Sequence, residues 1–491
     1  MNLQFIAFFF ILEKVEEVMG MHLPDFKVAR TNTKIAYETK QFHLDERYRN
    51  QYKGKTCYLR TYGCQMNEHD SENIKGILEE MGFSMIDDYE QADLIILNTC
   101  SIRENAHNKA FGFLGRVKHL KEIKPEIMVG LCGCMAQEEV VAKKVLEDYP
   151  WLNFVIGTHN FYELPYVLDQ SLQEHKLQIE VYSREKDLVE GMPIERDNPY
   201  KAYINIIYGC DKFCTYCIVP YTRGRQRSRA KEDIIAEVKS LVEAGYQEVT
   251  LLGQNVNAYG KDLYTDYSLA ELLADVAKTN IPRIRFMTSH PWDFTDEMIE
   301  VIASYPNIMP SIHLPVQSGS SCVLKRMGRR YSREEYLTLF HKMKEKIARC
   351  TISTDIIVGF PGESEEDFQE TLSLVKTCKF DNAFTFIYSP RVGTPAAKLT
   401  DNLTKEEKEK RLHILNQLVN QYFLENNQKL VNTVLPVLIE GKSPKKEDSY
   451  FGYTDTNKLV NVSGNVKEGS IVPVLITDAK TWSLDGKVYN G

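Results

Sequence analysis

Three cysteines lie close together near the middle of the chain, with three and then two residues between them. They are Cys210, Cys214 and Cys217, and they follow an apolar run that stops at Gly209. Three thiolates on one short loop can hold three irons of a [4Fe-4S] cube, whereas a structural zinc ion needs four ligands. The loop contains no fourth Cys or His. The spacing therefore predicts an iron-sulfur cluster with one iron open to a small ligand, and an incomplete zinc site or a chance grouping is the alternative.

A basic stretch follows this loop, with five cations and no acid between residues 223 and 231. Because the chain carries a net charge of -8, any binding to a polyanion must come from local basic patches of this kind. We expect Arg223, Arg225 and Arg227 to contact RNA phosphates. The alternative is an ordinary solvated face.

A second set of three cysteines is spread over the N-terminal part of the chain. Cys64, Cys100 and Cys134 each follow a predicted strand. Because the carboxyl ends of parallel strands meet at one rim of a sheet, these cysteines could hold a second cluster there. Cys132 competes for the third position, but Cys134 is favoured because it follows the strand-ending Gly133. Three unrelated buried cysteines are the alternative, since free cysteine is often buried.

The N-terminal part alternates strands and helices from about residue 55. The predicted strands are 56–62, 92–98, 127–132 and a last one at 154–157, and the predicted helices are 69–81, 102–120 and 136–147. This order predicts a doubly wound parallel α/β domain with right-handed crossovers. The polar residues 171–198 are interpreted as a linker.

A strand followed by a helix occurs six times in the next part of the chain. The predicted strands are 202–208, 248–253, 283–288, 311–316, 351–358 and 382–388, and the predicted helices are 231–244, 268–278, 294–303, 332–348, 364–377 and 404–430. Six such units predict a partial (βα)6 barrel, short of the eight that close a full one. Its chemistry should lie at the carboxyl ends of the strands, where Cys210, Gln254, Ser289, Gln317 and Gly359 fall.

The last segment, 431–491, changes to short apolar runs separated by Gly, Asn and Asp, which predicts a small all-β barrel. Its aromatic residues could stack on unpaired bases and its lysines could meet phosphates. The residues in question are Tyr450, Phe451, Tyr453, Trp482, Lys442, Lys445, Lys446 and Lys458. The alternative for the aromatic residues is a place in the core of the barrel.

The chain has 491 residues, which suits about three domains, and its eleven cysteines are typical of a reducing compartment where thiols bind metals. An apolar run at residues 5–12 is too short to span a bilayer and lacks a basic flank. We therefore predict a cytoplasmic protein without a membrane segment. Residues 1–54 are interpreted as an N-terminal extension, and translation from Met19 or Met21 remains an alternative for its first part.

Motifs along the chain resemble those of the methylthiotransferases, radical S-adenosylmethionine (SAM) enzymes that replace a C–H bond with a methylthio group. The match runs from about residue 55 to the end and is most similar to the MiaB-type branch. The motifs are TYGCQMN, NTCSIREN, GCMAQ, GCDKFCTYCIVPYTRGR, GQNVNAYG, HLPVQSGS, TDIIVGFPGE and FTFIYSPRVGTPAA. The resemblance implies an auxiliary-cluster domain over 55–170, a radical SAM barrel over 199–430 and an RNA-binding TRAM domain over 431–491.

The resemblance also implies a role for each set of cysteines. Cys64, Cys100 and Cys134 would ligate an auxiliary [4Fe-4S] cluster, and the Cys210, Cys214, Cys217 cluster would bind SAM through its open iron. Further SAM contacts are expected from Tyr216, Gly253, Gln254, Asn255, Gln317 and Gly359. One departure is Tyr453, where relatives often carry an arginine, so the TRAM segment lacks one expected phosphate contact.

The implied activity is methylthiolation of carbon 2 of N6-isopentenyladenosine at position 37 of tRNA, beside the anticodon. It requires an external electron donor and a sulfur donor. Two alternatives remain within the family, namely threonylcarbamoyladenosine in tRNA or a ribosomal protein as the substrate. An iron-sulfur electron carrier or an RNA-binding scaffold is the non-enzymatic alternative.

Overall fold

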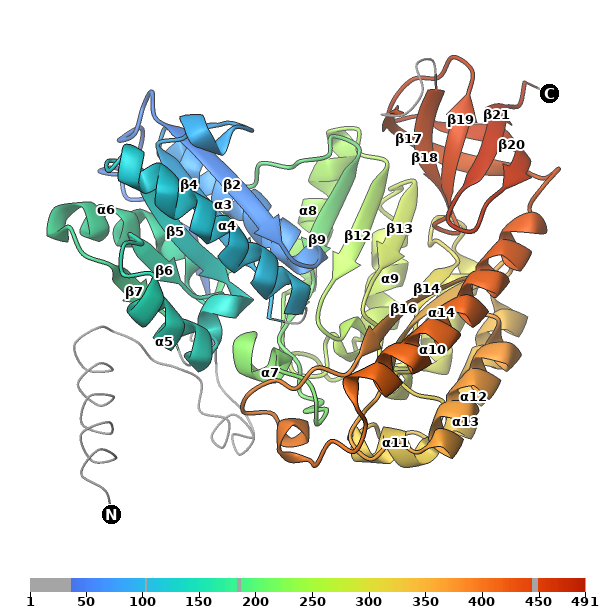
Figure 1. Cartoon of the computed structure of the whole chain (residues 1–491). Helices are drawn as coiled ribbons and strands as arrows, with labels where there is room; N and C mark the ends of the chain where they lie inside the picture. The colour runs from blue at the N-terminus through green and yellow to red at the C-terminus, as the bar shows by residue number, and fades with distance from the viewer. Residues whose placement is uncertain (1–36, 102–103, 183–186, 444–448, 491) are drawn as a thin grey trace.

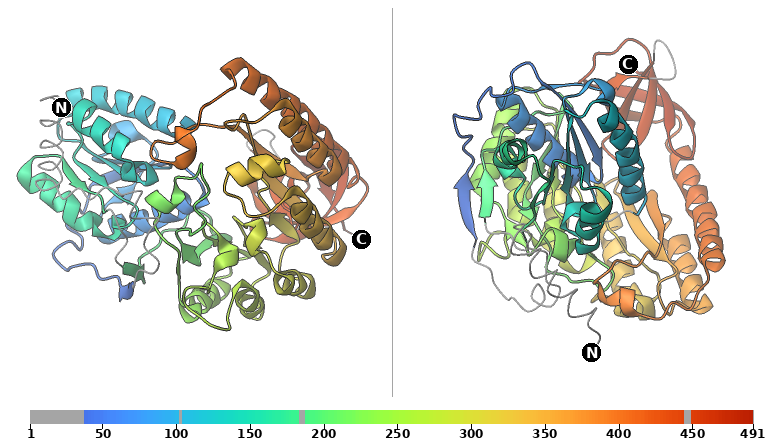
Figure 2. Two further views of the ribbon diagram at one scale, coloured as in Figure 1. Left: turned by 90° about the horizontal axis from the view of Figure 1, so that it is seen from below. Right: turned by 60° about the vertical axis from the view of Figure 1, so that its left-hand side comes forward.

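The computed structural model of the protein describes residues 37–101, 104–182, 187–443 and 449–490, which form three units along the chain (Figure 1). The N-terminal unit lies on one side of the central unit, and the long helix α14 (Lys405–Gln428) lies on the other (Figure 2).

The N-terminal unit is a six-stranded parallel sheet in the order β3-β2-β4-β5-β6-β7. Its strands are β2 (Thr56–Tyr62), β3 (Ser84–Met85), β4 (Leu94–Thr99), β5 (Met128–Gly133), β6 (Phe154–Ile156) and β7 (Gln178–Glu180). Its helices are α3 (Gln65–Glu80), α4 (Glu104–Ile123), α5 (Glu139–Asp148) and α6 (Leu164–Glu174). Apolar residues of α3 and α6 cover one face of the sheet, and those of α4 and α5 cover the other. This confirms the predicted doubly wound fold.

Two sequence-based expectations differ from this unit. The strand at 154–157 is not the last, because β7 extends the sheet from within the predicted linker. Its three residues bury only Ile179 and so carry little apolar signal. Helix α3 begins at Gln65 and not at residue 69, because its first turns contain polar residues that are nonetheless buried, among them Asn67 and Asp70.

A short sheet joins two further segments that the sequence left without structure. Strand β1 (Glu38–Gln41) pairs in parallel with β8 (Asp187–Glu190). Part of the predicted N-terminal extension is therefore attached to part of the predicted linker.

The central unit is the partial barrel, built from two three-stranded parallel sheets. The strands are β9 (Lys201–Asn205), β12 (Glu248–Leu252) and β13 (Arg283–Phe286), in the order β13-β12-β9, and β14 (Ser311–His313), β15 (Thr351–Val358) and β16 (Asn382–Ile387), in the order β14-β15-β16. An isolated parallel bridge between Ile284 and Ile308 lies between the two sheets. All six predicted strands are confirmed in position, although the first, third and fourth end two or three residues earlier than predicted. The first continues as β10 (Ile207–Tyr208), which pairs with β11 (Arg227–Ser228).

Helices cover the outside of this barrel and share one core with its strands. They are α8 (Lys231–Glu243), α9 (Leu269–Ala277), α10 (Asp296–Ser304), α12 (Arg333–Lys346), α13 (Glu365–Cys378) and α14. Two shorter helices, α7 (Val219–Thr222) and α11 (Ser321–Arg326), lie at the carboxyl ends of the strands (Figure 1). We call this end the barrel mouth.

The C-terminal unit is a closed barrel in the strand order β17-β18-β19-β21-β20, as predicted. Its strands are β17 (Val434–Lys442), β18 (Ser449–Thr454), β19 (Leu459–Ser463), β20 (Ile471–Ala479) and β21 (Leu484–Val488). Alternate residues such as Val437, Val460 and Val474 fill its interior.

The C-terminal barrel is attached to the amino ends of the central strands, opposite the barrel mouth. Arg283, the first residue of β13, donates to the carbonyls of Tyr453 and Pro436, both at 2.9 Å. Arg285 donates to the carbonyl of Thr454 at 2.7 Å. Both guanidiniums are buried beside Glu248, so this end of the barrel is closed by a polar interface.

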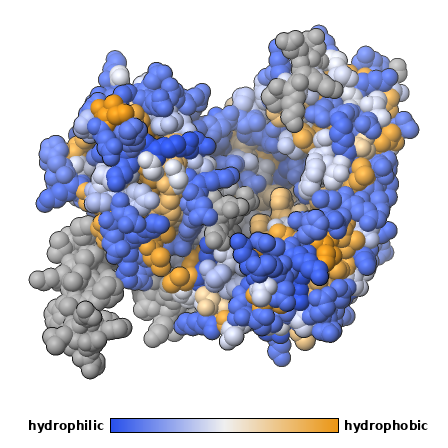
Figure 3. All heavy atoms as spheres, viewed as in Figure 1, coloured by the Kyte–Doolittle hydropathy of each residue, from blue (hydrophilic) through white to orange (hydrophobic). Residues whose placement is uncertain are grey.

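The molecular face shown in Figure 3 is mostly hydrophilic and is hollowed between the N-terminal unit and the other two. No helix within the described ranges combines the length and the apolar composition needed to cross a bilayer.

Candidate functional site

The cysteine loop after β10 is fixed by the backbone around Gly209. This residue has a φ of +72°, and a Cβ there would overlap the carbonyl of Arg225, so the turn requires glycine. The N–H of Gly209 donates to Oε1 of Gln254 at 2.5 Å, and the N–H of Cys210 donates to the carbonyl of Gly224 at 3.1 Å. The loop is therefore held at the carboxyl end of β12.

The three thiols of this loop lie beside one another at the barrel mouth, with Cys214 buried and the other two partly exposed. Desolvation raises the pKa of Cys210, and the neighbouring Cys217 and Cys214 raise it further. Desolvation, with Cys214 next, also raises the pKa of Cys217 to about 12. Three thiolates that repel one another need positive charge between them, so this donor set fits three irons of a [4Fe-4S] cluster.

Sequence reasoning missed Arg329, which contacts this loop from the turn after α11. Its Nη1 donates to Sγ of Cys214 at 3.6 Å, and its Nη2 donates to the carbonyl of Pro315 at 2.8 Å. Its Nε donates to the hydroxyl of Tyr331 at 2.9 Å. A single arginine in a turn gives no sequence signal for this role, since only the fold brings it to a cysteine more than a hundred residues away.

Two residues predicted to contact SAM are engaged with the protein itself. Gln254 accepts from Gly209, as described above. Nδ2 of Asn255 donates to Asp293 at 2.7 Å, and Lys212 forms an ion pair with the same carboxylate at 2.6 Å. These residues organise the cysteine loop and the neighbouring strand ends, and any contact with SAM stays a prediction.

The other predicted SAM contacts also lie at the barrel mouth. A Cβ on Gly253 would overlap the side chain of Ile207, so close packing explains that glycine. Gln317 and Gly359 both have a φ of +71° and follow β14 and β15. The ring of Tyr216 packs edge-on against Phe360, with 6.4 Å between centroids. Their roles toward SAM stay predictions.

The second set of cysteines comes together at the carboxyl ends of the N-terminal sheet. Cys64 is the N-cap of α3, Cys100 follows β4 and Cys134 follows β5. The Cys100 thiol lowers the pKa of Cys64 to about 6, against the raising effect of burial and with help from Arg223. Burial raises the pKa of Cys134, and Arg223 opposes that effect. Three convergent thiols next to a buried cation again fit an iron-sulfur cluster.

Cys132 lies elsewhere, inside the core between β5 and the helices α3 and α6. Gly133 turns the chain between it and Cys134, with a φ of +95°, and a Cβ there would overlap the side chain of Asn98. Asn98 in turn accepts from Nδ2 of Asn67 at 3.2 Å and donates to Oγ of Ser71 at 2.9 Å. Sequence reasoning missed this buried amide network, which packs beneath the turns that carry the three cysteines, on the side of the sheet.

No three His, Cys, Asp or Glu side chains of the described residues approach closely enough to bind a single metal ion. A four-iron cube requires wider spacing between its cysteines, because its irons and sulfides lie between them.

The two cysteine sets belong to different units, and direct contacts join them. Oγ1 of Thr158 donates to the carbonyl of Thr222 at 2.7 Å. Nε of Arg223 donates to Sγ of Cys134 at 3.0 Å, and its Nη2 donates to Asp70 on α3 at 2.6 Å. The carboxyl ends of both sheets therefore meet at α7.

These contacts contradict the expected phosphate role of Arg223, whose guanidinium is buried between Asp70 and Cys134. Arg227 is also buried, and its guanidinium lies over the Tyr208 ring at 6.0 Å. Arg225 pairs with Asp211 at 3.0 Å and keeps some exposure. Of the three arginines, only Arg225 stays a predicted RNA contact.

Some of the predicted RNA contacts of the C-terminal barrel are also engaged within the protein itself. Lys458 donates to the carbonyl of Asp381 at 3.0 Å, and burial lowers its pKa, so it supports the docking interface and not a phosphate. The Tyr453 ring faces Lys201 at 5.3 Å. Trp482 is 64% exposed, its ring packs edge-on against Phe423 at 5.4 Å, and its stacking on a base stays a prediction. Lys445 and Lys446 lie outside the described residues.

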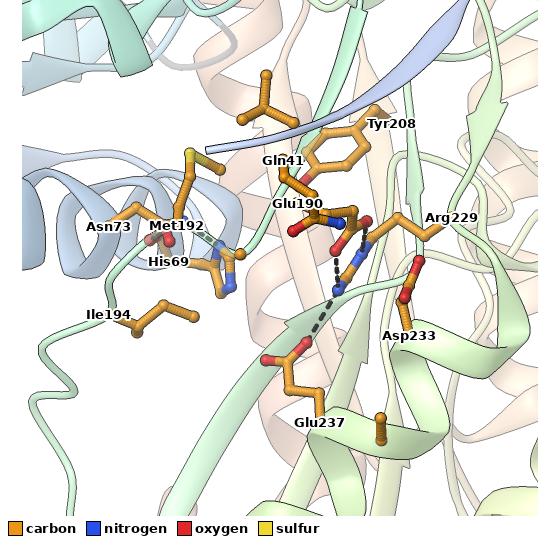
Figure 4. Close-up of a pocket in the computed structure, with 13 residues that line it drawn as sticks. Gln41, His69, Asn73, Glu190, Met192, Ile194, Tyr208, Arg229, Asp233 and Glu237 are labelled. Atoms are coloured by element: carbon orange, nitrogen blue, oxygen red, sulfur yellow. Dashed lines mark hydrogen bonds and ion pairs between the residues drawn. The ribbon is translucent and has the colours of Figure 1, made fainter. Parts of the chain in front are cut away.

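A cavity of about 290 Å³ opens between the N-terminal and central units, and none of its lining residues is a cysteine (Figure 4). Arg229 crosses its wall and pairs with Glu190 at 2.6 Å and Glu237 at 3.0 Å. On the opposite wall, Nδ1 of His69 accepts from the amides of Asn73 and Asn205 at 3.1 and 3.0 Å. The proton of His69 therefore lies on Nε2, which has no hydrogen-bond partner among the described residues.

The burial of His69 makes the stability of the folded protein depend on pH. Burial lowers the pKa of His69 to about 3; Glu237 raises it, whereas Arg196, Arg229 and Arg223 lower it further. The unfolded chain takes up a proton near pH 6.5 and the folded chain does not, so stability is lost as the pH falls below 6.5. We expect the burial of neutral His69 to lower the free energy of unfolding by about 2 kcal/mol at pH 5 relative to pH 7.5.

Urea unfolding of the wild type and of His69→Gln at both pH values measures this cost. The glutamine oxygen can still accept from the two amides but cannot be protonated. An equal loss of stability in the two proteins between pH 7.5 and pH 5 would show that His69 is not the cause.

Three segments of the chain match known families. Residues 56–157 match the uncharacterized protein family UPF0004, residues 204–375 match the radical SAM superfamily, and residues 428–489 match the TRAM domain. A solved structure of the radical SAM methyltransferase TsrM from Kitasatospora setae has a TM-score of 0.49 and 12% identity, and covers 70% of this chain and 75% of that one. The barrel, its three-cysteine loop and the matched segment define a radical SAM protein.

Two relatives match most of the chain and identify its family. A tRNA-2-methylthio-N(6)-dimethylallyladenosine synthase of Staphylococcus epidermidis is 52% identical over 466 residues, which are 94% of this chain and 91% of the relative. A synthase of the same name from Shouchella clausii is 54% identical over 438 residues, which are 89% and 84% of the two chains. The chain belongs to the family of tRNA-2-methylthio-N(6)-dimethylallyladenosine synthases.

Proposed function

We propose that the protein methylthiolates carbon 2 of N6-isopentenyladenosine at tRNA position 37. The names of its relatives, which match over nearly the whole chain, support this activity. One structural observation carries the proposal. Two sets of three cysteines, delivered by two different units, face the same meeting point of strand ends.

Cys210, Cys214 and Cys217 would hold one [4Fe-4S] cluster, and Cys64, Cys100 and Cys134 would hold the other. The chemistry that the first cluster would supply there is electron transfer for the reductive cleavage of SAM. The chain holds both loops in place through the contacts at α7, so that a base at the barrel mouth lies near both cysteine sets. Cys210 and Cys217 are partly exposed, which supports the binding of SAM at this loop.

Replacing a C–H bond with a C–S–CH₃ group requires more than the protein contains. The methyl group comes from a further SAM molecule, and the sulfur and electrons come from external donors. The described cysteines form no disulfide with one another, so all of them stay available as thiolate ligands, which is typical of proteins in a reducing compartment.

The isopentenyl group provides the basis for substrate choice. The target base must leave the stack of the anticodon loop to reach the barrel mouth. Burial of its five-carbon substituent contributes about 0.8 kcal/mol per CH₂ group, so a dry pocket favours the prenylated base by a few kcal/mol. We expect unmodified tRNA to react with a kcat/KM at least about tenfold lower.

Anaerobically reconstituted protein, SAM and reductant incubated with each tRNA would test this expectation by mass spectrometry of the nucleosides. The expected main product is 2-methylthio-N6-isopentenyladenosine. Methylthiolated threonylcarbamoyladenosine as the main product would assign the protein to the alternative substrate. Absence of 5′-deoxyadenosine under every condition would indicate an electron carrier or a scaffold.

A further inference from the structure

Arg223 is the residue through which the two cysteine sets are connected. It is the C-cap of α7, six residues after Cys217, yet its guanidinium lies in the N-terminal unit. Its side chain is only 6% exposed, and that of its partner Asp70 is 4% exposed. The planar fork of an arginine can donate to a carboxylate and a sulfur at once, which the single ammonium group of lysine cannot do with the same geometry.

The contact between Arg223 and Cys134 goes beyond what docking requires. The ion pair with Asp70 alone would join the two units, but Nε is directed at the cysteine sulfur. Oδ1 of Asp70 has no hydrogen-bond partner among the described residues, so the carboxylate is bound only on its Oδ2 side. The same pattern recurs at the other set, where Arg329 donates to Cys214. Each set of cysteines thus receives an N–H···S contact from a buried arginine.

We propose that Arg223 is a positioning residue that fixes Cys134 against the radical domain and raises the reduction potential of the auxiliary cluster. This inference rests on the proposed function for the presence of that cluster. A positive charge and an N–H donor beside a ligating sulfur stabilise the more negative, reduced state. Neutralising Asp70 leaves the arginine charge uncompensated, so it should raise the potential further, which is opposite to the effect of removing Arg223.

The test uses the full chain with Cys210, Cys214 and Cys217 replaced by alanine, so that only the auxiliary cluster is loaded. Redox titration followed by electron paramagnetic resonance then gives its midpoint potential. Arg223→Met should lower the potential, Arg223→Lys should restore part of the loss, and Asp70→Asn should raise the potential. Arg285→Met is the matched control, because Arg285 is also a buried interdomain arginine but lies at the far end of the barrel.

An unchanged potential in Arg223→Met, with about four irons retained, would overturn the proposal. If that variant loses its iron, Asp70→Asn decides, and a potential that stays the same or falls would overturn the proposal. In the otherwise wild-type protein, Arg223→Met should reduce methylthiolated product at least tenfold while SAM cleavage stays within twofold. The potential is measured without tRNA, so failure of the proposed function would show separately as a wild-type protein that forms no product.

Discussion

Replacement of Cys210, Cys214 and Cys217 together by alanine is expected to abolish SAM cleavage and to lower the iron content from about eight to about four per chain. The three thiols lie side by side at the barrel mouth, and the described residues near them include no other cysteine that could take their place. Iron analysis after anaerobic reconstitution and chromatography of 5′-deoxyadenosine after chemical reduction measure the two effects.

A matched control lies in the same unit. Cys322 is exposed on α11, whereas Cys350 and Cys378 are buried next to β15 and at the end of α13. Their triple alanine variant should keep about eight irons and full SAM cleavage. Formation of 5′-deoxyadenosine by the first variant would show that the radical site has been assigned to the wrong cysteines.

Replacement of Cys64, Cys100 and Cys134 by alanine should have a different result. The radical site is untouched, so SAM cleavage should continue, but methylthiolated tRNA should fall at least about a hundredfold because the second cluster is lost. Nucleoside mass spectrometry and 5′-deoxyadenosine measured in the same reaction separate the two steps.

Cys57 and Cys132 provide the control for this unit, since both lie in its hydrophobic core. Their double alanine variant should keep both clusters and form product. If it loses the auxiliary cluster and the Cys134→Ala variant keeps it, the third ligand is Cys132 and the sequence-based choice between the two cysteines is wrong.

The fold could be predicted wherever burial leaves a regular pattern in the sequence. Strand β4 is buried along its whole length and begins with four apolar residues. The strands of the central barrel are more mixed in polarity, but they recur at regular intervals between amphipathic helices. Segments that bury one or two side chains leave no such pattern. For this reason β7 and β8 cannot be recognised in the polar residues 171–198, which are interpreted as a linker.

The basic stretch at residues 223–231 shows a different limit of prediction from sequence. Alternating arginines on a short segment are typical of a phosphate-binding surface, and nothing local distinguishes them from buried ones. The partners that bury them are Asp70, Glu190 and Glu237, and the first lies 153 residues away from Arg223. The packing of the N-terminal unit against the barrel brings Asp70 within contact of Arg223, whereas Glu237 lies on α8 of the barrel itself, eight residues from Arg229.

The attachment of the C-terminal barrel to the amino ends of the central strands sets a minimum size for an RNA footprint. Both cysteine sets lie at the opposite, carboxyl ends, and β15 alone spans eight residues, or about 25 Å. An RNA that touches both the reacting centre and the C-terminal barrel must run along the outside of the molecule over at least that length. Shortening the substrate to its loop would therefore remove contacts with the C-terminal barrel while leaving the reacting base in place.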